Sequence, residues 1–184
     1  MPEQTSQKPE KTILAIKNGL EVELLNYGAT LKSIRVPVDD GSVDVLLSYP
    51  ADEDYLQDQV YLGATVGRYA GRVDSGFARV QGRPVQLVCN EKNTGHCLHG
   101  GSKGFSHQFW TVCERSSDSI SYEYVSAHGD QGFPGCLTTR VSYRLLGPTT
   151  LQIEFTAETD QETIVNLSNH AYFNLNSVNG GVGN

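Results

Sequence analysis

Alternation of apolar and polar residues is the feature that most narrows the folds open to this 184-residue chain. It is clearest at residues 137–145, LTTRVSYRL, where every second position from Leu137 suits a buried face. Successive side chains of a strand point to opposite faces of a sheet, so this period predicts short antiparallel strands, each with one buried face. The same period recurs at residues 20–24, 43–47, 120–124 and 151–155.

Turn residues separate these runs, and no linker divides them. The turns are expected at residues 39–41, 81–83 and 147–148. No stretch has the three-four spacing of an amphipathic helix, apart from a helical turn near residues 52–57. The sequence therefore predicts a single all-β domain, an antiparallel β-sandwich over residues 13–184, after a polar and disordered leader at residues 1–12.

Charge and hydropathy exclude two classes of partner. The net charge is −7, and Lys and Arg occur singly, so no positive surface is expected for nucleic acid or an anionic membrane. No apolar run approaches the length that spans a bilayer, and the polar N-terminus lacks the apolar segment of a secretory signal. We therefore expect a cytoplasmic protein, whose four cysteines are free thiols.

The stretch GATVGRYAGRV, residues 63–73, contains three glycines around Arg68 and Arg72. Glycine allows the backbone to approach a ligand closely, and an arginine donates a planar pair of N–H groups to ligand oxygens. The stretch has the pattern of neither a phosphate-binding loop nor a dinucleotide fingerprint. The alternative is a tight corner of the chain with two surface arginines.

The stretch HCLHGGSKGF, residues 96–105, contains His96 and His99 beside two glycines. With Cys97 these histidines suggest a metal site, but no second pair of ligands follows at the spacing of a zinc site. The other interpretation is a glycine loop that leaves one imidazole open to a polar ligand. His107 and His128 have the context of surface or turn histidines.

The stretch IVNLSNHAYFNLN, residues 164–176, begins like a buried strand, yet Asn166, Ser168 and His170 share one parity. Aromatic rings follow at Tyr172 and Phe173. Aromatic rings pack on the C–H faces of sugars while Asn and His bind hydroxyls, and histidine exchanges protons near neutral pH. The stretch therefore favours a sugar-binding site; the alternative is a histidine inside a polar core network.

Together, these three stretches resemble the aldose 1-epimerase family, the galactose mutarotases. The resemblance runs from about residue 20 to residue 176, and its specific signatures are Leu-His-Gly-Gly and Asn-His-Ala-Tyr-Phe-Asn-Leu. It implies the galactose mutarotase-like β-sandwich. It also implies an isomerase without cofactor or metal that interconverts the α and β anomers of aldohexoses such as galactose and glucose.

The resemblance also implies roles for particular residues. His170 is expected to be the general acid that protonates the sugar ring oxygen, and His99 the second active-site histidine, near the ring and C1. Arg72 is expected to bind the substrate, and Asn169 and Tyr172 to add further substrate contacts.

The sequence departs from the family pattern in two ways. Gly71, a further expected substrate-binding position, replaces the asparagine that family members usually carry before Arg72. The glutamate base and a substrate-binding aspartate of the family, which lie in the second half of longer chains, have no counterpart. The acidic residues near the end of the chain lie outside any matching motif: Glu154, Glu158 and Asp160. We therefore expect a sandwich that is incomplete at its C-terminus, or alternatively a non-catalytic carbohydrate-binding protein on the same scaffold.

Overall fold

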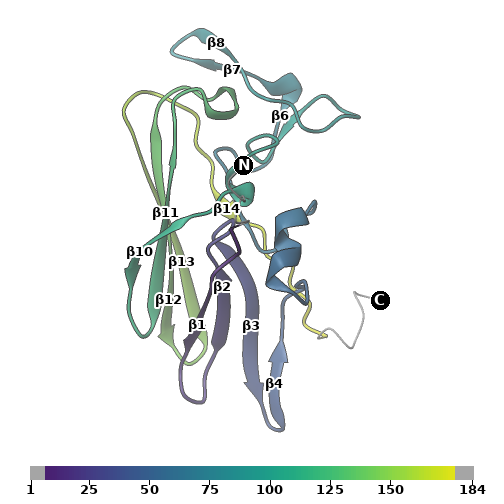
Figure 1. Cartoon of the computed structure of the whole chain (residues 1–184), viewed down its shortest axis with the longest axis vertical. Coiled ribbons are helices and arrows are strands. Elements are labelled where there is room, and N and C mark those ends of the chain that lie inside the picture. The colour runs from purple at the N-terminus through teal and green to yellow at the C-terminus, as the bar shows by residue number, and fades with distance from the viewer. Residues whose placement is uncertain (1–6, 177–184) are drawn as a thin grey trace, which may run out of the picture.

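Two four-stranded antiparallel sheets form the body of the protein in a computed structural model, which describes residues 7–176 (Figure 1). The first sheet consists, in order, of β1 (Lys11–Ala15), β2 (Glu21–Leu25), β3 (Thr30–Val38) and β4 (Gly41–Asp44). The second consists, in order, of β10 (Thr111–Arg115), β11 (Ser119–Ser126), β12 (Leu137–Gly147) and β13 (Thr150–Thr159). The predicted all-β antiparallel sandwich is confirmed.

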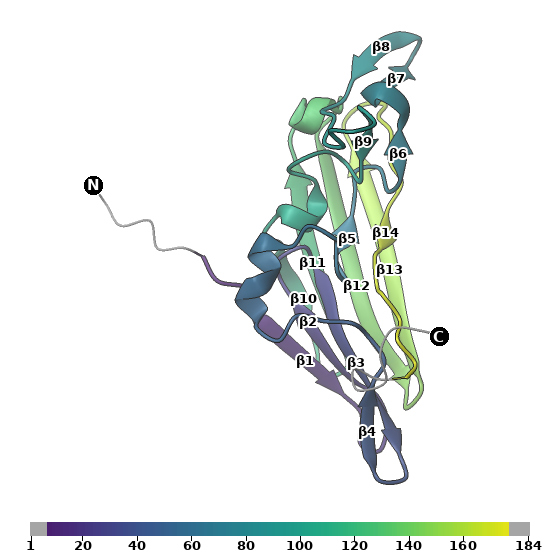
Figure 2. The same cartoon turned by 90° about the vertical axis from the view of Figure 1, so that its right-hand side faces the viewer.

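Short strand pairs and 3₁₀ helices make up the rest of the described chain. The pairs are β5 (Thr65–Val66) with β14 (Ser168–Asn169), β6 (Arg72–Val73) with β9 (Cys97–Leu98), and β7 (Phe77–Val80) with β8 (Arg83–Gln86). The 3₁₀ helices are Asp52–Gln57, Asp74–Gly76, Phe105–His107 and Asp130–Gly132. The β7–β8 pair lies beyond one end of the sandwich, and the β6–β9 pair lies beside that end (Figure 2). Within residues 7–176 we find no helix with the length and apolar character needed to cross a membrane.

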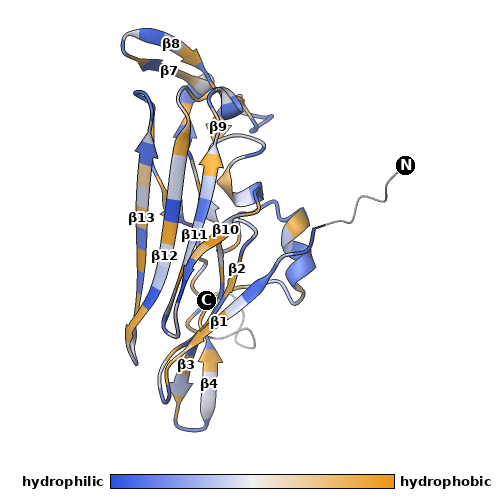
Figure 3. Ribbon diagram, turned by 60° about the vertical axis from the view of Figure 1, so that its left-hand side comes forward, coloured by the Kyte–Doolittle hydropathy of each residue, from blue (hydrophilic) through white to orange (hydrophobic). Residues whose placement is uncertain are grey.

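The core fills the space between the two large sheets. Along β12 every second side chain from Leu137 to Leu145 is buried, as the alternation predicts. Apolar and polar residues alternate along the strands in the hydropathy view (Figure 3). Each fully buried large apolar side chain contributes about 1.5–3 kcal/mol, so this shared core holds the sheets together. Its members from the first sheet include Leu14, Val22, Leu24 and Leu31, and those from the second include Ile120, Tyr122, Val141 and Tyr143.

Connections fall where turn residues predict them, with one correction at the N-terminus. The β7–β8 hairpin turns at Gln81 and Gly82, whose φ angles of 50° and 73° are those a type I′ turn requires. However, β1 begins at Lys11, so the predicted leader of residues 1–12 ends too late. Thr12 is buried and pairs with β2, which holds these residues in the sheet.

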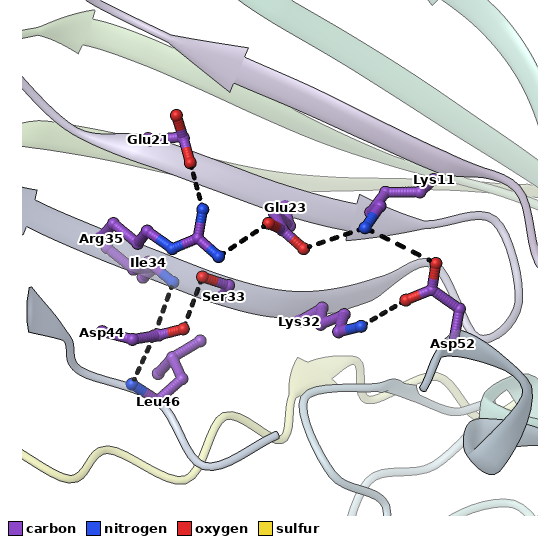
Figure 4. A network of polar contacts seen from close by, with 10 residues as sticks. All are labelled: Lys11, Glu21, Glu23, Lys32, Ser33, Ile34, Arg35, Asp44, Leu46 and Asp52. Carbon is purple, nitrogen blue, oxygen red and sulfur yellow. Dashed lines mark hydrogen bonds and ion pairs between the residues drawn. The ribbon is translucent and has the colours of Figure 1, made fainter. Parts of the chain in front are cut away.

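A row of alternating charges covers the outer face of the first sheet (Figure 4). Glu23 lies between Arg35, at 3.1 Å, and Lys11, at 3.5 Å. Asp52 accepts hydrogen bonds from Lys32 and faces Lys11. Because the side chains of Glu23 and Lys32 are only 9% and 8% exposed, each needs its charged partner. Through Asp52, these ion pairs hold the 3₁₀ helix Asp52–Gln57 against the first sheet. They therefore also fix the position at which the segment from residue 58 begins.

The polar segment at residues 164–176 joins neither large sheet. It runs beside residues 46–69 through single bridges at Asn166 and Phe173 and through the β14–β5 pair. The expectation of a buried run at its start is wrong for Val165, which is 39% exposed, because the segment lies along the outside of the short loops.

Candidate active site

Two histidines from distant parts of the chain meet beside the short strand pairs. His99 directly follows β9, and His170 directly follows β14. Their ring centroids lie 5.1 Å apart, with the rings nearly perpendicular at 88°. The structure thus brings together the two histidines that the sequence singles out.

The backbone of His170 is held on both sides. Its N–H donates to the carbonyl of Ala64 at 2.8 Å, and its carbonyl accepts from Gly63 N–H at 3.0 Å. The Asn169 amide donates to the Gly63 carbonyl at 2.8 Å and to the Tyr143 hydroxyl at 3.3 Å. These bonds fix the strand before His170, so the amide of Asn169 is already in use, and a sugar contact by this residue stays a prediction.

Two tyrosines frame the histidine pair. The Tyr61 ring lies 4.7 Å from the ring of His99, 5.8 Å from that of His170 and 6.0 Å from that of His107. The Tyr172 ring lies 5.0 Å from that of His170, and its hydroxyl donates to the carbonyl of Val60. His170 therefore has two aromatic rings beside it. Its ring nitrogens have no hydrogen-bond partner among residues 7–176, which leaves them open to a ligand.

A backbone contact selects the tautomer of His99. Its Nδ1 accepts a hydrogen bond from the N–H of Gly71 at 3.0 Å, so the proton of the neutral ring is on Nε2. Burial, followed by the charges of His170 and Arg72, lowers the pKa of His99 to about 4. His99 is therefore neutral near pH 7 and offers one N–H donor, which suits it to hold a sugar oxygen rather than to transfer a proton.

The lowered pKa predicts that acid weakens the fold through His99. The unfolded chain takes up a proton near pH 6.5, whereas folded His99 does so only near pH 4, so the unfolded state binds more protons between these values. Stability therefore falls as the pH drops from 6.5 towards 4, by about 1 kcal/mol, because solvent screens this half-buried ring. His99→Asn, which tolerates the φ of 50° found here, should flatten this dependence in urea titrations at pH 7, 5.5 and 4. Equal slopes for both proteins would contradict the assignment.

A polar cavity of about 400 Å³ adjoins Tyr61. Asn90 organises one wall: its amide exchanges hydrogen bonds with the Leu98 backbone at 2.7 and 3.0 Å and donates to the Tyr61 hydroxyl at 3.3 Å. Sequence reasoning missed Tyr61, Asn90 and Glu91. Only their place as a polar pair directly after the apolar residues 87–89 hints at the last two. The residues that line the cavity are Gln59, Tyr61, Asn90, Glu91, Leu98, Ser102 and His107.

The two arginines of residues 63–73 have different environments. Arg72 lies opposite Leu98 in the β6–β9 pair, next to His99, and its guanidinium donates to both oxygens of Glu91. Arg68 is 2% exposed and bonded on all sides, so the alternative of two surface arginines is wrong for this residue. Gly71 has a φ of 102°, and a Cβ there would meet no atom within 4 Å, so the missing asparagine leaves open space.

The histidines of residues 96–105 have separate partners. His96 Nδ1 accepts from the N–H of Ser75 and faces Asp74, whereas His99 Nδ1 faces Gly71. Cys97 is buried, and burial raises the pKa of its thiol to about 11. No group of three His, Cys, Asp or Glu in the part of the chain that the structure describes is placed to hold a metal ion.

Comparison with known proteins gives a consistent set of relatives. The family model described as aldose 1-epimerase matches residues 11–182. The aldose 1-epimerase of Haemophilus influenzae is 39% identical over 165 residues, which cover 90% of this chain and 47% of that protein. The galactose mutarotase of Pongo abelii is 38% identical over 157 residues, 85% of this chain and 45% of that protein. This chain thus spans about half the length of the curated relatives it matches.

Solved structures give the same result. The aldose epimerase homologue from C. elegans has a TM-score of 0.83 at 31% identity, over 91% of this chain and 51% of that one. The galactose 1-epimerase from Lactobacillus acidophilus has a TM-score of 0.80 at 30% identity, over 95% of this chain and 52% of that one. The fold of this chain thus has counterparts in experimental structures.

Proposed function

Because this chain belongs to the aldose 1-epimerase family, we propose that its two-histidine site binds an aldohexose and promotes interconversion of the α and β anomers. The observation that carries the proposal is the pairing of His99 and His170 at 5.1 Å, with the rings of Tyr61 and Tyr172 beside His170. Such an arrangement presents N–H groups and aromatic faces together, which is what a pyranose ring requires.

In the proposed reaction His170 supplies the proton. Its imidazolium protonates the ring oxygen while a base removes the proton of the C1 hydroxyl, and the C1–O5 bond breaks to give the open aldehyde. Rotation about C1–C2 turns the other face of the aldehyde to the C5 hydroxyl, and the same proton transfers run in reverse. The neutral His99 donates its Nε2–H to a sugar oxygen and holds the ring in place.

The described residues offer a poor candidate for the base. Glu91 lines the cavity, but its hydrogen bonds with Arg72 lower the pKa of its carboxyl, which makes it a weaker proton acceptor. We therefore propose that residues 7–176 supply the acid and the sugar-binding groups of the reaction but not its base. Loss of one general acid–base group typically costs ~10²–10⁴-fold in rate, so we expect slow turnover compared with a protein that has it.

The Arg72–Glu91 ion pair favours a second candidate, a carbohydrate-binding protein without catalysis. The ion pair of Arg72 and Glu91 can form hydrogen bonds with sugar hydroxyl groups whether or not the sugar ring then opens. The two functions differ in one measurable property, the rate at which a free anomer equilibrates.

Polarimetry on freshly dissolved α-D-galactose and α-D-glucose tests the proposal. We expect the chain to speed the approach to anomeric equilibrium in proportion to its concentration. Methyl α-D-galactoside, whose blocked C1 oxygen prevents ring opening, should slow this reaction by competition. Binding of the methyl galactoside in an NMR titration without any acceleration would instead support the binding protein. If the chain neither binds the methyl galactoside nor accelerates mutarotation, both functions are overturned.

A further inference from the structure

Arg72 and Glu91 form a two-point ion pair at the edge of the site. Arg72 Nε donates to Glu91 Oε2 at 2.8 Å, and Nη2 donates to Oε1 at 2.7 Å. The Thr94 hydroxyl donates to Oε2 at 3.0 Å and fixes the carboxylate from its other side. The Glu91 side chain is 19% exposed, whereas that of Arg72 is 58% exposed. Glu91 is thus the anchored member of the pair, and Arg72 is the member that it holds.

The pair keeps unused hydrogen-bonding groups. A guanidinium has five N–H donors, and the two bonds to Glu91 leave three, including both on Nη1. Oε1 of Glu91 accepts one bond, so it can accept another. Donors and an acceptor therefore lie side by side on two groups that are already oriented.

The pair also lies next to the histidines. Arg72 is the strand partner of Leu98, the residue before His99, and its charge acts on the pKa of His99. Glu91 lines the polar cavity together with Tyr61 and Asn90. Glu91 thus links the wall of this cavity to Arg72, which lies opposite the residue that precedes His99.

We propose that Glu91 is a positioning and specificity residue that holds Arg72, so that the pair binds two adjacent hydroxyls of the sugar. One hydroxyl accepts from Arg72 Nη1 and the other donates to Glu91 Oε1. The inference rests on the proposed function and names the feature of the substrate that this edge of the site recognises, a vicinal diol. Binding a pre-oriented arginine avoids the entropy cost of ordering a long, exposed side chain.

An ordinary surface ion pair would not have these properties. Arg140 and Glu114 make one contact at 3.2 Å on the outer face of the second sheet, with the glutamate side chain 68% exposed. This pair is a matched control, because it has the same two residue types and neither lines the cavity beside Tyr61.

The first arm of the test reports on Arg72 without any sugar. In ¹⁵N NMR spectra the Nε–H of Arg72 should exchange slowly with water in the wild type and in Glu114→Gln. In Glu91→Gln the signal should broaden or disappear, because a neutral amide cannot make the two charged contacts. An unchanged Arg72 signal in Glu91→Gln would overturn the positioning role.

The second arm measures affinity for D-galactose and methyl α-D-galactoside by NMR titration. We expect Glu91→Gln to weaken binding about two- to tenfold, and Glu114→Gln to leave it unchanged. In an Arg72→Gln background the further loss from Glu91→Gln should be less than twofold, because Glu91 acts through the arginine. Full additivity of the two losses, or no loss in Glu91→Gln, would overturn the proposal.

The two arms separate this inference from the proposed function. An intact Arg72 signal with no sugar binding in the wild type would overturn the proposed function and, with it, the diol contact. Sugar binding by the wild type with a rapidly exchanging Arg72 would leave the proposed function standing and overturn the role of Glu91. Monodeoxy-galactoses complete the test: at least one deoxy position should weaken binding in the wild type and have little effect in Glu91→Gln.

Discussion

Replacement of Arg68 with methionine should lower the free energy of unfolding by about 3–5 kcal/mol, the largest stability loss that we expect from a single substitution. The guanidinium is 2% exposed and makes four hydrogen bonds. Nε donates to the Ser126 hydroxyl at 3.0 Å, and the other bonds, of 2.7–2.9 Å, go to the carbonyls of Ser126, Ala127 and Pro134. Methionine fills much of the same volume but leaves those carbonyls buried without donors.

The size of this effect follows from what Arg68 joins. It comes from residues 63–73, and all four of its bonds go to residues 126–134, which include the connection between β11 and β12. The face of the guanidinium also packs 5.7 Å from the ring of Phe133. Loss of the arginine therefore frees the loop that carries Arg72 from the second sheet. Arg68→Lys keeps the charge but cannot reach all four acceptors, so we expect it to be destabilising too.

Urea unfolding of Arg68→Met, Arg68→Lys and Arg79→Met measures this effect. Arg79 is an exposed arginine of the β7–β8 hairpin that, within residues 7–176, donates to the neighbouring Gly82 carbonyl and lies 5.7 Å from the exposed ring of Phe77, so its substitution should change the free energy by less than about 0.5 kcal/mol. Equal, small losses at positions 68 and 79 would show that the buried arginine does not hold the two loops together.

The β-sandwich could be predicted from the sequence because its signal is local. In β12 each buried side chain is two residues from the next. This pattern can be recognised without knowing that β11 and β13 are its neighbours in the sheet. The β7–β8 turn is equally local, since Gln81-Gly82-Arg83 lies between Val80 and Val85. The resemblance of short motifs to the family predicted His99 and His170 as active-site residues, and the fold brings these two side chains together.

The remainder of the site depends on contacts between distant segments. Arg68 and Arg72 both follow a glycine, and only the loop at residues 126–134 decides that one is buried and the other exposed. Tyr61 belongs to no motif, yet its ring contacts three histidines because residues 58–66 run beside β14. Neither feature has a signal within ten residues of sequence.

The second large effect that we expect is on activity: His170→Asn should reduce any acceleration of galactose mutarotation to the spontaneous rate. Removal of a general acid typically lowers the rate ~10²–10⁴-fold. Because we expect the rate of this chain to be low already, a loss of that size would leave only the spontaneous reaction. The fold should tolerate the change, because the bonds that hold residue 170 are made by its backbone, to Gly63 and Ala64. Polarimetry of both proteins, with melting curves as the check on folding, measures the effect. His128→Asn, at an exposed histidine outside the site, is the control and should keep full activity.

His99→Asn completes the argument because it separates the two roles within the pair. If His99 only donates a hydrogen bond from Nε2, its loss should raise KM for galactose several-fold while kcat falls less than in His170→Asn. Methyl α-D-galactoside should then bind about as tightly to His170→Asn as to the wild type, and more weakly to His99→Asn. The reverse pattern, with kcat lost in His99→Asn and affinity lost in His170→Asn, would mean that the proton passes through His99. A half-buried ring whose pKa lies near 4 is poorly suited to that task at neutral pH, because it is rarely protonated there.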